Sequence, residues 1–279
     1  MSSLQNAREA PLWLDSFDKS LHGRKPLDGP VSVDVAIIGG GYSGLWTAYY
    51  LLENDPSLRV LIIEKEFCGY GASGRNGGWC EGALAGGTEK YAKRSTMGEA
   101  LRLERTMFQT VDEIQRVLDS EDINCDFHKG GFVSVARNLP QAQRQRSAVE
   151  LARERGTGEE IIRILDADEA RAHVNASNVH SGIFFAPSAV VDPGKMVRGL
   201  AKAVERKGGT IVEGTTALSI STGKVVCAEG IVSADVIVQA TEGYTRDIKG
   251  KKLDLLPVYS RMIATEPLTD SQISEIGLA

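Results

Sequence analysis

Residues 33–64 read VDVAIIGGGYSGLWTAYYLLENDPSLRVLIIE, and this stretch decides the fold. The apolar run over 33–38 predicts a buried strand, and the run from 45 to 52 is typical of a helix. A second apolar run over 58–63 predicts another strand, which ends at Glu64. Strand, glycine turn, helix and strand in this order are typical of a dinucleotide-binding βαβ unit.

The glycine turn Gly39-Gly40-Gly41-Tyr42-Ser43-Gly44 joins the first strand to the helix. Gly39 permits a tight turn, Gly41 leaves the backbone open to a pyrophosphate, and Gly44 lets the helix pack closely on the strand. The helix N-terminus then offers N–H groups to the phosphates. Glu64 comes about 20 residues after Gly44, where an acid accepts hydrogen bonds from a ribose diol, which favours FAD or NAD over NADP. The alternative is a glycine-rich turn with a structural role only.

The bulk composition is that of an ordinary globular protein. The chain has 279 residues, of which 42% are hydrophobic and 25% charged, and its formal net charge of −5 argues against general nucleic-acid binding. We find no apolar run of membrane-spanning length and no signal-peptide pattern, so we expect a cytoplasmic protein without a membrane partner. The four cysteines and four histidines form no ligand-like spacing, and we expect no metal site.

The remainder of the chain alternates predicted helices and strands around a glycine-rich loop over 69–87, which we interpret as functional. Asp192-Pro193 is a typical helix start, with aspartate as N-cap and proline in the first turn. A buried strand over 234–240 runs into the turn Thr241-Glu242-Gly243-Tyr244, which can close around the same nucleotide. Further helices are predicted over 99–119, over 140–155 and from a capping box at Asp166 and Glu169, and further strands over 131–136, 182–186, 210–212, 215–220, 225–228 and 256–266.

The order of these elements predicts an α/β fold with two domains. Pieces of the Rossmann-like domain lie at 30–95 and 190–250, and an α+β second domain, at 96–189 and 251–279, is inserted into it. Residues 1–29 are expected to form an irregular arm, which Trp13, Leu14 and Phe17 could pin to the body.

Five separated motifs resemble the FAD-dependent D-amino-acid oxidase/glycine oxidase superfamily, in particular its gamma-glutamylputrescine oxidoreductase-like branch. They are the glycine turn, Glu64, the loop Ala72-Ser73-Gly74-Arg75-Asn76-Gly77-Gly78, the helix from Pro193 and the turn from Ala240 to Tyr244. The resemblance implies an FAD-binding domain with an inserted substrate domain. It also implies oxidation of a carbon–nitrogen bond in an amine or amino acid, with oxygen or another electron acceptor. Relatives continue past residue 279, so the substrate domain is expected to be incomplete here.

The resemblance also implies roles for single residues. Arg75 would stabilise negative charge and Asn76 would hydrogen-bond the flavin edge, and these two are our catalytic candidates. For Arg75 the alternative is a structural salt bridge or a phosphate contact, and for Asn76 a turn residue. The expected FAD contacts are Gly39, Gly41, Tyr42, Ser43, Gly44, Glu64, Lys65, Ser73, Gly74, Arg75, Asn76, Gly77, Thr216, Ala217, Thr241 and Gly243.

Two other functions stay open at this point. A pyridine-nucleotide reductase shares the βαβ unit, but it needs a second complete G-x-G-x-x-G unit, and the sequence has none. A non-catalytic chain that binds a flavin or nucleotide is the alternative from a different class.

Overall fold

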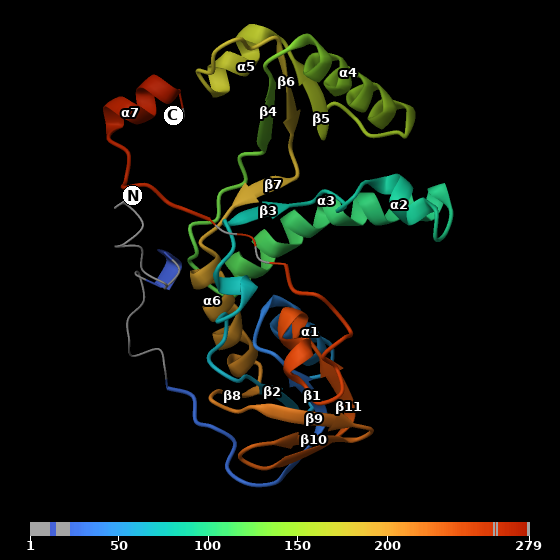
Figure 1. Cartoon of the computed structure of the whole chain (residues 1–279), viewed down its shortest axis with the longest axis vertical. Helices are drawn as coiled ribbons and strands as arrows, with labels where there is room; N and C mark the ends of the chain where they lie inside the picture. The colour runs from blue at the N-terminus through green and yellow to red at the C-terminus, as the bar shows by residue number, and fades with distance from the viewer. Residues whose placement is uncertain (1–11, 15–22, 259, 261, 278–279) are drawn as a thin grey trace. The chain divides into compact units, whose positions relative to one another are not determined.

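The computed structural model describes residues 12–14, 23–258, 260 and 262–277 (Figure 1). Within them the chain divides into two compact units. Of the described residues, the first comprises those up to Gly77, Glu121–Cys125 and those within Asp192–Met262, and the second comprises Gly78–Ser120, Asp126–Val191 and those from Ile263 onward. These boundaries differ from the expected ones, because residues 78–95 belong to the second unit and residues 251–262 to the first.

The first unit is built on a six-stranded sheet in the order β8-β2-β1-β11-β10-β9 (Figure 1). Strands β1, β2, β8 and β11 are mutually parallel, and the β9–β10 hairpin extends the sheet in antiparallel fashion. The carboxyl ends of the four parallel strands therefore meet at one edge of the sheet. The bounds are β1 (Val31–Ile38), β2 (Val60–Ile63), β8 (Thr210–Val212), β9 (Ala217–Ser221), β10 (Lys224–Cys227) and β11 (Ile231–Gln239).

The centre of this sheet is buried on both faces, which explains its unbroken apolar runs. Ile37 on β1 pairs in register with Ile62 on β2 and Val238 on β11, and both isoleucines are fully buried. Two helices, α1 (Tyr42–Asn54) and α6 (Pro193–Arg206), pack on each other; α1 also packs against β1 and β2, and α6 against β8. The first unit also contains the 3₁₀ turns η1 (Leu12–Leu14), η3 (Ala72–Gly74) and η4 (Glu242–Asp247).

The second unit contains two small antiparallel sheets and five helices among its described residues. One sheet has the order β4-β6-β5 and the other pairs β3 with β7. A small apolar cluster around Leu165, Ala170 and Val179 packs with α5 under the three-stranded sheet. The bounds are β3 (Trp79–Glu81), α2 (Thr88–Ala92), α3 (Met97–Ser120), β4 (Phe132–Ala136), α4 (Leu139–Glu154), β5 (Ile162–Leu165), α5 (Ala167–His173), β6 (Ser181–Phe185), β7 (Ser188–Val190) and α7 (Asp270–Ile276).

The predicted α/β class is confirmed, and so are the predicted starts of two helices. The Asp192 carboxylate accepts the N–H of Lys195 at 2.9 Å as N-cap of α6, and Asp166 and Glu169 form a capping box at α5. The predicted strand over 256–266 is wrong, because the described residues of this segment pair with no strand. Its alternating apolar side chains are exposed instead, with Val258 at 88%.

The N-terminal arm can be followed in part. Trp13 in η1 donates its indole N–H to the backbone oxygen of Asn76 at 2.7 Å, which ties this turn to the glycine-rich loop. The expectation for Phe17 lies outside the described residues. Among the helices that the structure describes, none is both long enough and apolar enough to cross a membrane.

Candidate nucleotide-binding site

The glycine turn after β1 has a geometry that only glycine can adopt. Gly39 has a φ of 113°, and a Cβ on it would lie 2.4 Å from the backbone oxygen of Ala240. A Cβ on Gly44 would lie 2.1 Å from the backbone oxygen of Gly39. The turn is therefore pressed between the end of β11 and the start of α1, as its predicted tightness requires.

Helix α1 begins at this turn without a side-chain cap, because Gly41 occupies the N-cap position. The first N–H groups of a helix have no acceptor within the helix, and the helix dipole places partial positive charge there. The Tyr42 N–H donates to the Ser73 hydroxyl at 2.9 Å, and a Cβ on Gly41 would lie 2.9 Å from the same oxygen. The N-terminus of α1 and η3 thus lie close together, and a side chain on Gly41 would have to displace the Ser73 hydroxyl.

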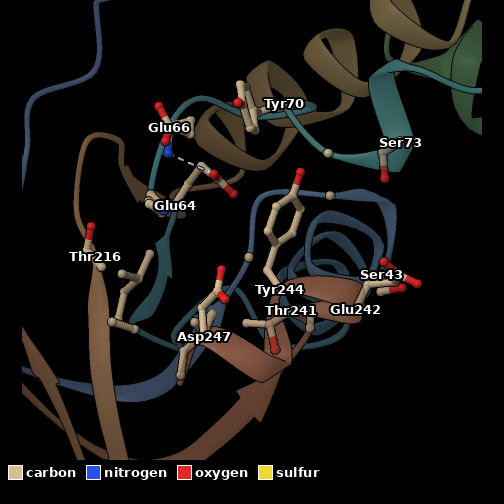
Figure 2. A pocket seen from close by; sticks show the side chains of 18 of the residues that line it. Ser43, Glu64, Glu66, Tyr70, Ser73, Thr216, Thr241, Glu242, Tyr244 and Asp247 are labelled. Atoms are coloured by element: carbon tan, nitrogen blue, oxygen red, sulfur yellow. Dashed lines mark hydrogen bonds between the residues drawn. The ribbon is translucent and has the colours of Figure 1, made fainter. Parts of the chain in front are cut away.

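Glu64, at the end of β2, turns its carboxylate back toward the glycine turn. Its Oε1 accepts the N–H of Glu66 at 2.9 Å (Figure 2). Its Oε2 accepts the N–H of Gly40 at 2.7 Å. Burial raises the pKa of Glu64, which the two N–H donors partly oppose, and the nearby carboxylate of Glu213 adds to the rise. Each oxygen keeps a further lone pair, so the carboxylate can accept two more hydrogen bonds.

The opposite wall comes from the segment that follows β11. The hydroxyls of Thr241 and Thr245 lie 2.7 Å apart and fix the start of η4. Tyr244 projects from η4 into the pocket (Figure 2), and a Cβ on Gly71 would lie 3.2 Å from its ring. The aromatic rings of Tyr70 and Tyr244 are 6.5 Å apart between centroids. Two segments distant in sequence therefore meet across the pocket.

These segments enclose a cavity of about 290 Å³ in the first unit. Of the expected FAD contacts, the lining contains Gly39, Gly41, Tyr42, Ser43, Glu64, Lys65, Ser73, Thr216, Ala217 and Thr241. The other lining residues were not among the expected single contacts, although Ala72, Ala240, Glu242 and Tyr244 lie in the predicted motifs. They are Ile38, Ile63, Glu66, Gly69, Tyr70, Gly71, Ala72, Thr215, Leu218, Ala240, Glu242, Tyr244, Asp247 and Ile248. Most of these residues are neighbours of a predicted contact along the chain, so their position next to the motifs could have identified them from the sequence.

Six expected contacts do not line this cavity, namely Gly44, Gly74, Arg75, Asn76, Gly77 and Gly243. The Arg75 guanidinium donates to the backbone oxygen of Tyr70 and lies over its ring, 4.6 Å from the centroid. The Asn76 amide donates to the backbone oxygens of Ser73, at 2.9 Å, and Ala72, at 3.2 Å. These contacts give the two side chains a structural part in the loop, and their catalytic roles stay predictions.

The parallel sheet carries a glycine turn at the carboxyl end of β1 and an acidic residue, Glu64, at the carboxyl end of β2. This combination defines a dinucleotide-binding protein of the Rossmann type. The sequence matches the DAO family, described as FAD dependent oxidoreductase, over residues 34–278. The chain belongs to this family, and the predicted family resemblance is confirmed.

Two curated relatives carry oxidoreductase names. The probable oxidoreductase OrdL of Haemophilus influenzae is 30% identical over 260 residues, covering 88% of this chain and 58% of that protein. The gamma-glutamylputrescine oxidoreductase of Escherichia coli is 28% identical over 251 residues, covering 88% and 57%. The chain thus spans somewhat more than half the length of these relatives.

Solved structures show the same fold. Glycine oxidase from Geobacillus kaustophilus superposes with a TM-score of 0.64 at 22% identity, covering 79% of this chain and 58% of that one. L-amino acid deaminase from Proteus myxofaciens gives a TM-score of 0.67 at 20% identity, covering 82% and 49%.

The pocket fits the cofactor of this family, FAD. Gly41 adds no side chain of its own at the α1 N-terminus, where the Ser73 hydroxyl accepts the Tyr42 N–H, and Glu64 offers acceptors of the kind that ribose hydroxyls need. Acidic side chains outnumber basic ones in the lining, where Lys65 is accompanied by Glu64, Glu66, Glu242 and Asp247. The charge of a pyrophosphate here must therefore be met chiefly by backbone N–H groups and the helix dipole.

Proposed function

We propose that the first unit holds FAD in this pocket and that the protein oxidises a carbon–nitrogen bond of an amine or amino acid. The observation that carries the proposal is the Glu64 carboxylate, which is fixed by the Gly40 N–H at 2.7 Å beside a helix N-terminus where Gly41 adds no side chain of its own. Membership of the DAO family supports the cofactor, and the relatives' names support the substrate class.

When bound, FAD accepts a hydride from the carbon next to nitrogen, and the resulting imine is hydrolysed by water. In this proposal the first N–H groups of α1 bind the pyrophosphate and Glu64 accepts hydrogen bonds from the adenosine ribose. Thr216 and Ala217 contact the adenine, and Thr241 and Gly243 line the cofactor from the other side.

The loop from Ser73 to Gly77 lies along the flavin and its linker in the proposed complex. Arg75 supplies positive charge for the reduced flavin, and Asn76 hydrogen-bonds the flavin edge. We assign substrate recognition to the second unit and reoxidation to oxygen or another acceptor. The cytoplasmic location stays a prediction from the sequence.

The test is a visible absorption spectrum of the purified chain, before and after anaerobic addition of an amine and amino-acid panel. The panel includes gamma-glutamylputrescine and glycine, because relatives are named for these substrates. We expect a flavin spectrum that bleaches with one class of substrate. A flavin spectrum that never bleaches favours a non-catalytic binding chain, and the absence of flavin after reconstitution with FAD refutes the proposal for this chain.

A further inference from the structure

Arg24, which precedes β1, connects two acidic side chains from distant parts of the first unit. Its Nε and one terminal nitrogen donate to the two carboxylate oxygens of Glu205 on α6, each at 2.7 Å. Its other terminal nitrogen donates to Oε1 of Glu213, directly after β8, at 2.8 Å. The side chains of Arg24 and Glu213 are 17% and 6% exposed, so this is a largely buried ion pair.

The same oxygen of Glu213 reaches the loop that follows β2. It accepts the N–H of Cys68 at 2.9 Å, and this hydrogen bond is buried. The Cys68 sulfur in turn lies against the glycine turn, because a Cβ on Gly40 would be 2.7 Å from it and 3.2 Å from the Glu64 carboxylate. A continuous set of contacts therefore runs from Arg24 to the residues that present Glu64.

A second tie joins the same N-terminal segment to the pocket. The Leu27 N–H donates to the Thr215 hydroxyl at 2.9 Å, and Thr215 lines the cavity. The Thr215 N–H donates to the backbone oxygen of Glu64 at 2.9 Å, and the Gly214 N–H to that of Glu66 at 3.2 Å. Residues 24–27 thus brace the two segments that form the Glu64 side of the pocket.

Charge explains why arginine is needed at this point. The Glu213 carboxylate lies close enough to Glu64 to disfavour ionisation of Glu64 and so raises its pKa. Arg24 compensates Glu213. Removing the arginine would take away this ion pair and leave the buried carboxylate with the Cys68 N–H and thiol as hydrogen-bond partners and with the charge of Arg198 nearby. The resulting rearrangement of Glu213 would release the Cys68 N–H and with it the loop after β2.

We propose that Arg24 is a positioning residue for the adenosine half of the cofactor, acting through Glu213 and the 64–68 loop to fix the Glu64 carboxylate. The inference rests on the proposed function, because it assumes that Glu64 receives the ribose. It adds a segment outside the βαβ unit to the binding site.

The experiment compares Arg24→Gln, Arg24→Lys and the matched control Arg59→Gln in the 279-residue chain. Arg59 makes a comparable pair with Asp34 in the same unit, but its side chain is 61% exposed and its contacts lie away from the pocket. Dissociation constants for FAD are measured by flavin fluorescence and those for ADP by calorimetry. Thermal unfolding of the FAD-free chains reports on stability separately.

We expect Arg24→Gln to raise the dissociation constants for both FAD and ADP by about tenfold. Arg24→Lys should give a smaller loss, because one ammonium keeps the charge but cannot reproduce three N–H donors to two carboxylates. This variant also keeps the test usable if Arg24→Gln does not fold. Arg59→Gln should change both constants by less than about twofold.

The double variant Arg24→Gln/Glu213→Gln tests the route of the effect. If Arg24 acts through Glu213, the Arg24 substitution adds nothing to the loss already caused by Glu213→Gln. Three outcomes overturn this inference but leave the proposed function standing. They are wild-type affinity in both Arg24 variants, an equal loss of affinity in Arg59→Gln, and full additivity in the double variant. A wild-type chain that binds neither FAD nor ADP overturns the proposed function, and this inference with it.

Discussion

Glu64→Gln keeps the shape of the side chain at the end of β2 but removes its charge and one of its two acceptor oxygens. Those oxygens accept the N–H groups of Gly40, at 2.7 Å, and Glu66, at 2.9 Å, so the new amide nitrogen must face one of these donors. A hydrogen bond to a charged group contributes about 1.5–3 kcal/mol. Losing one such bond to the ribose raises the FAD dissociation constant by roughly 10- to 150-fold.

The assay is flavin fluorescence titration of the FAD-free chain, with Glu53→Gln as the control. Glu53 lies on α1 in the same unit and pairs with Lys207, outside the cavity lining. We expect the control to bind FAD with the wild-type constant. An unchanged constant for Glu64→Gln, in a chain whose thermal unfolding remains cooperative, refutes our assignment of Glu64 to the ribose.

The same substitution has a second, pH-dependent consequence for the FAD-free chain. Burial raises the pKa of Glu64 in the folded chain above its value in the unfolded chain. At a pH below the pKa of Glu64 in the unfolded chain, the carboxyl is protonated in both the folded and the unfolded chain. As the pH rises through the pKa of Glu64 in the folded chain, the buried carboxyl must ionise, and its contribution to stability is lost. Urea unfolding across this pH window should therefore show Glu64→Gln gaining stability relative to wild type, with a constant difference at higher pH. A difference that does not vary with pH contradicts the argument.

The remaining predictions concern stability. Gly44→Ala places a methyl group 2.1 Å from the backbone oxygen of Gly39, and we expect urea unfolding to show a loss of about 3 kcal/mol. Gly41→Ala meets only the Ser73 hydroxyl, which can rotate away, so it should cost less than about 1 kcal/mol while weakening FAD binding measurably. Equal losses of stability in the two variants would contradict this. Asp192→Ala removes the N-cap of α6 and should lower the free energy of unfolding by about 1 kcal/mol, whereas an unchanged melting temperature would argue against the cap.

Prediction from sequence succeeded where the determinants are local. Strands β1 and β2 are marked by unbroken apolar runs, and the start of α6 at Asp192 and the capping box at Asp166 depend on residues within one helical turn. It failed for the strand over 256–266, because alternating apolar residues form a strand only where a neighbouring strand supplies hydrogen-bond partners.

The sequence by itself determined the glycine turn, the helix N-terminus and the acid after the next strand, since all three lie within residues 33–64. Only the tertiary structure decided what closes the pocket. Tyr244 meets Gly71 because the parallel sheet order β8-β2-β1-β11 brings the carboxyl ends of β2 and β11 to one edge. Arg24 meets Glu213 because the segment before β1 runs beside the residues that follow β8. No local pattern encodes those pairings, since they depend on which strands become neighbours.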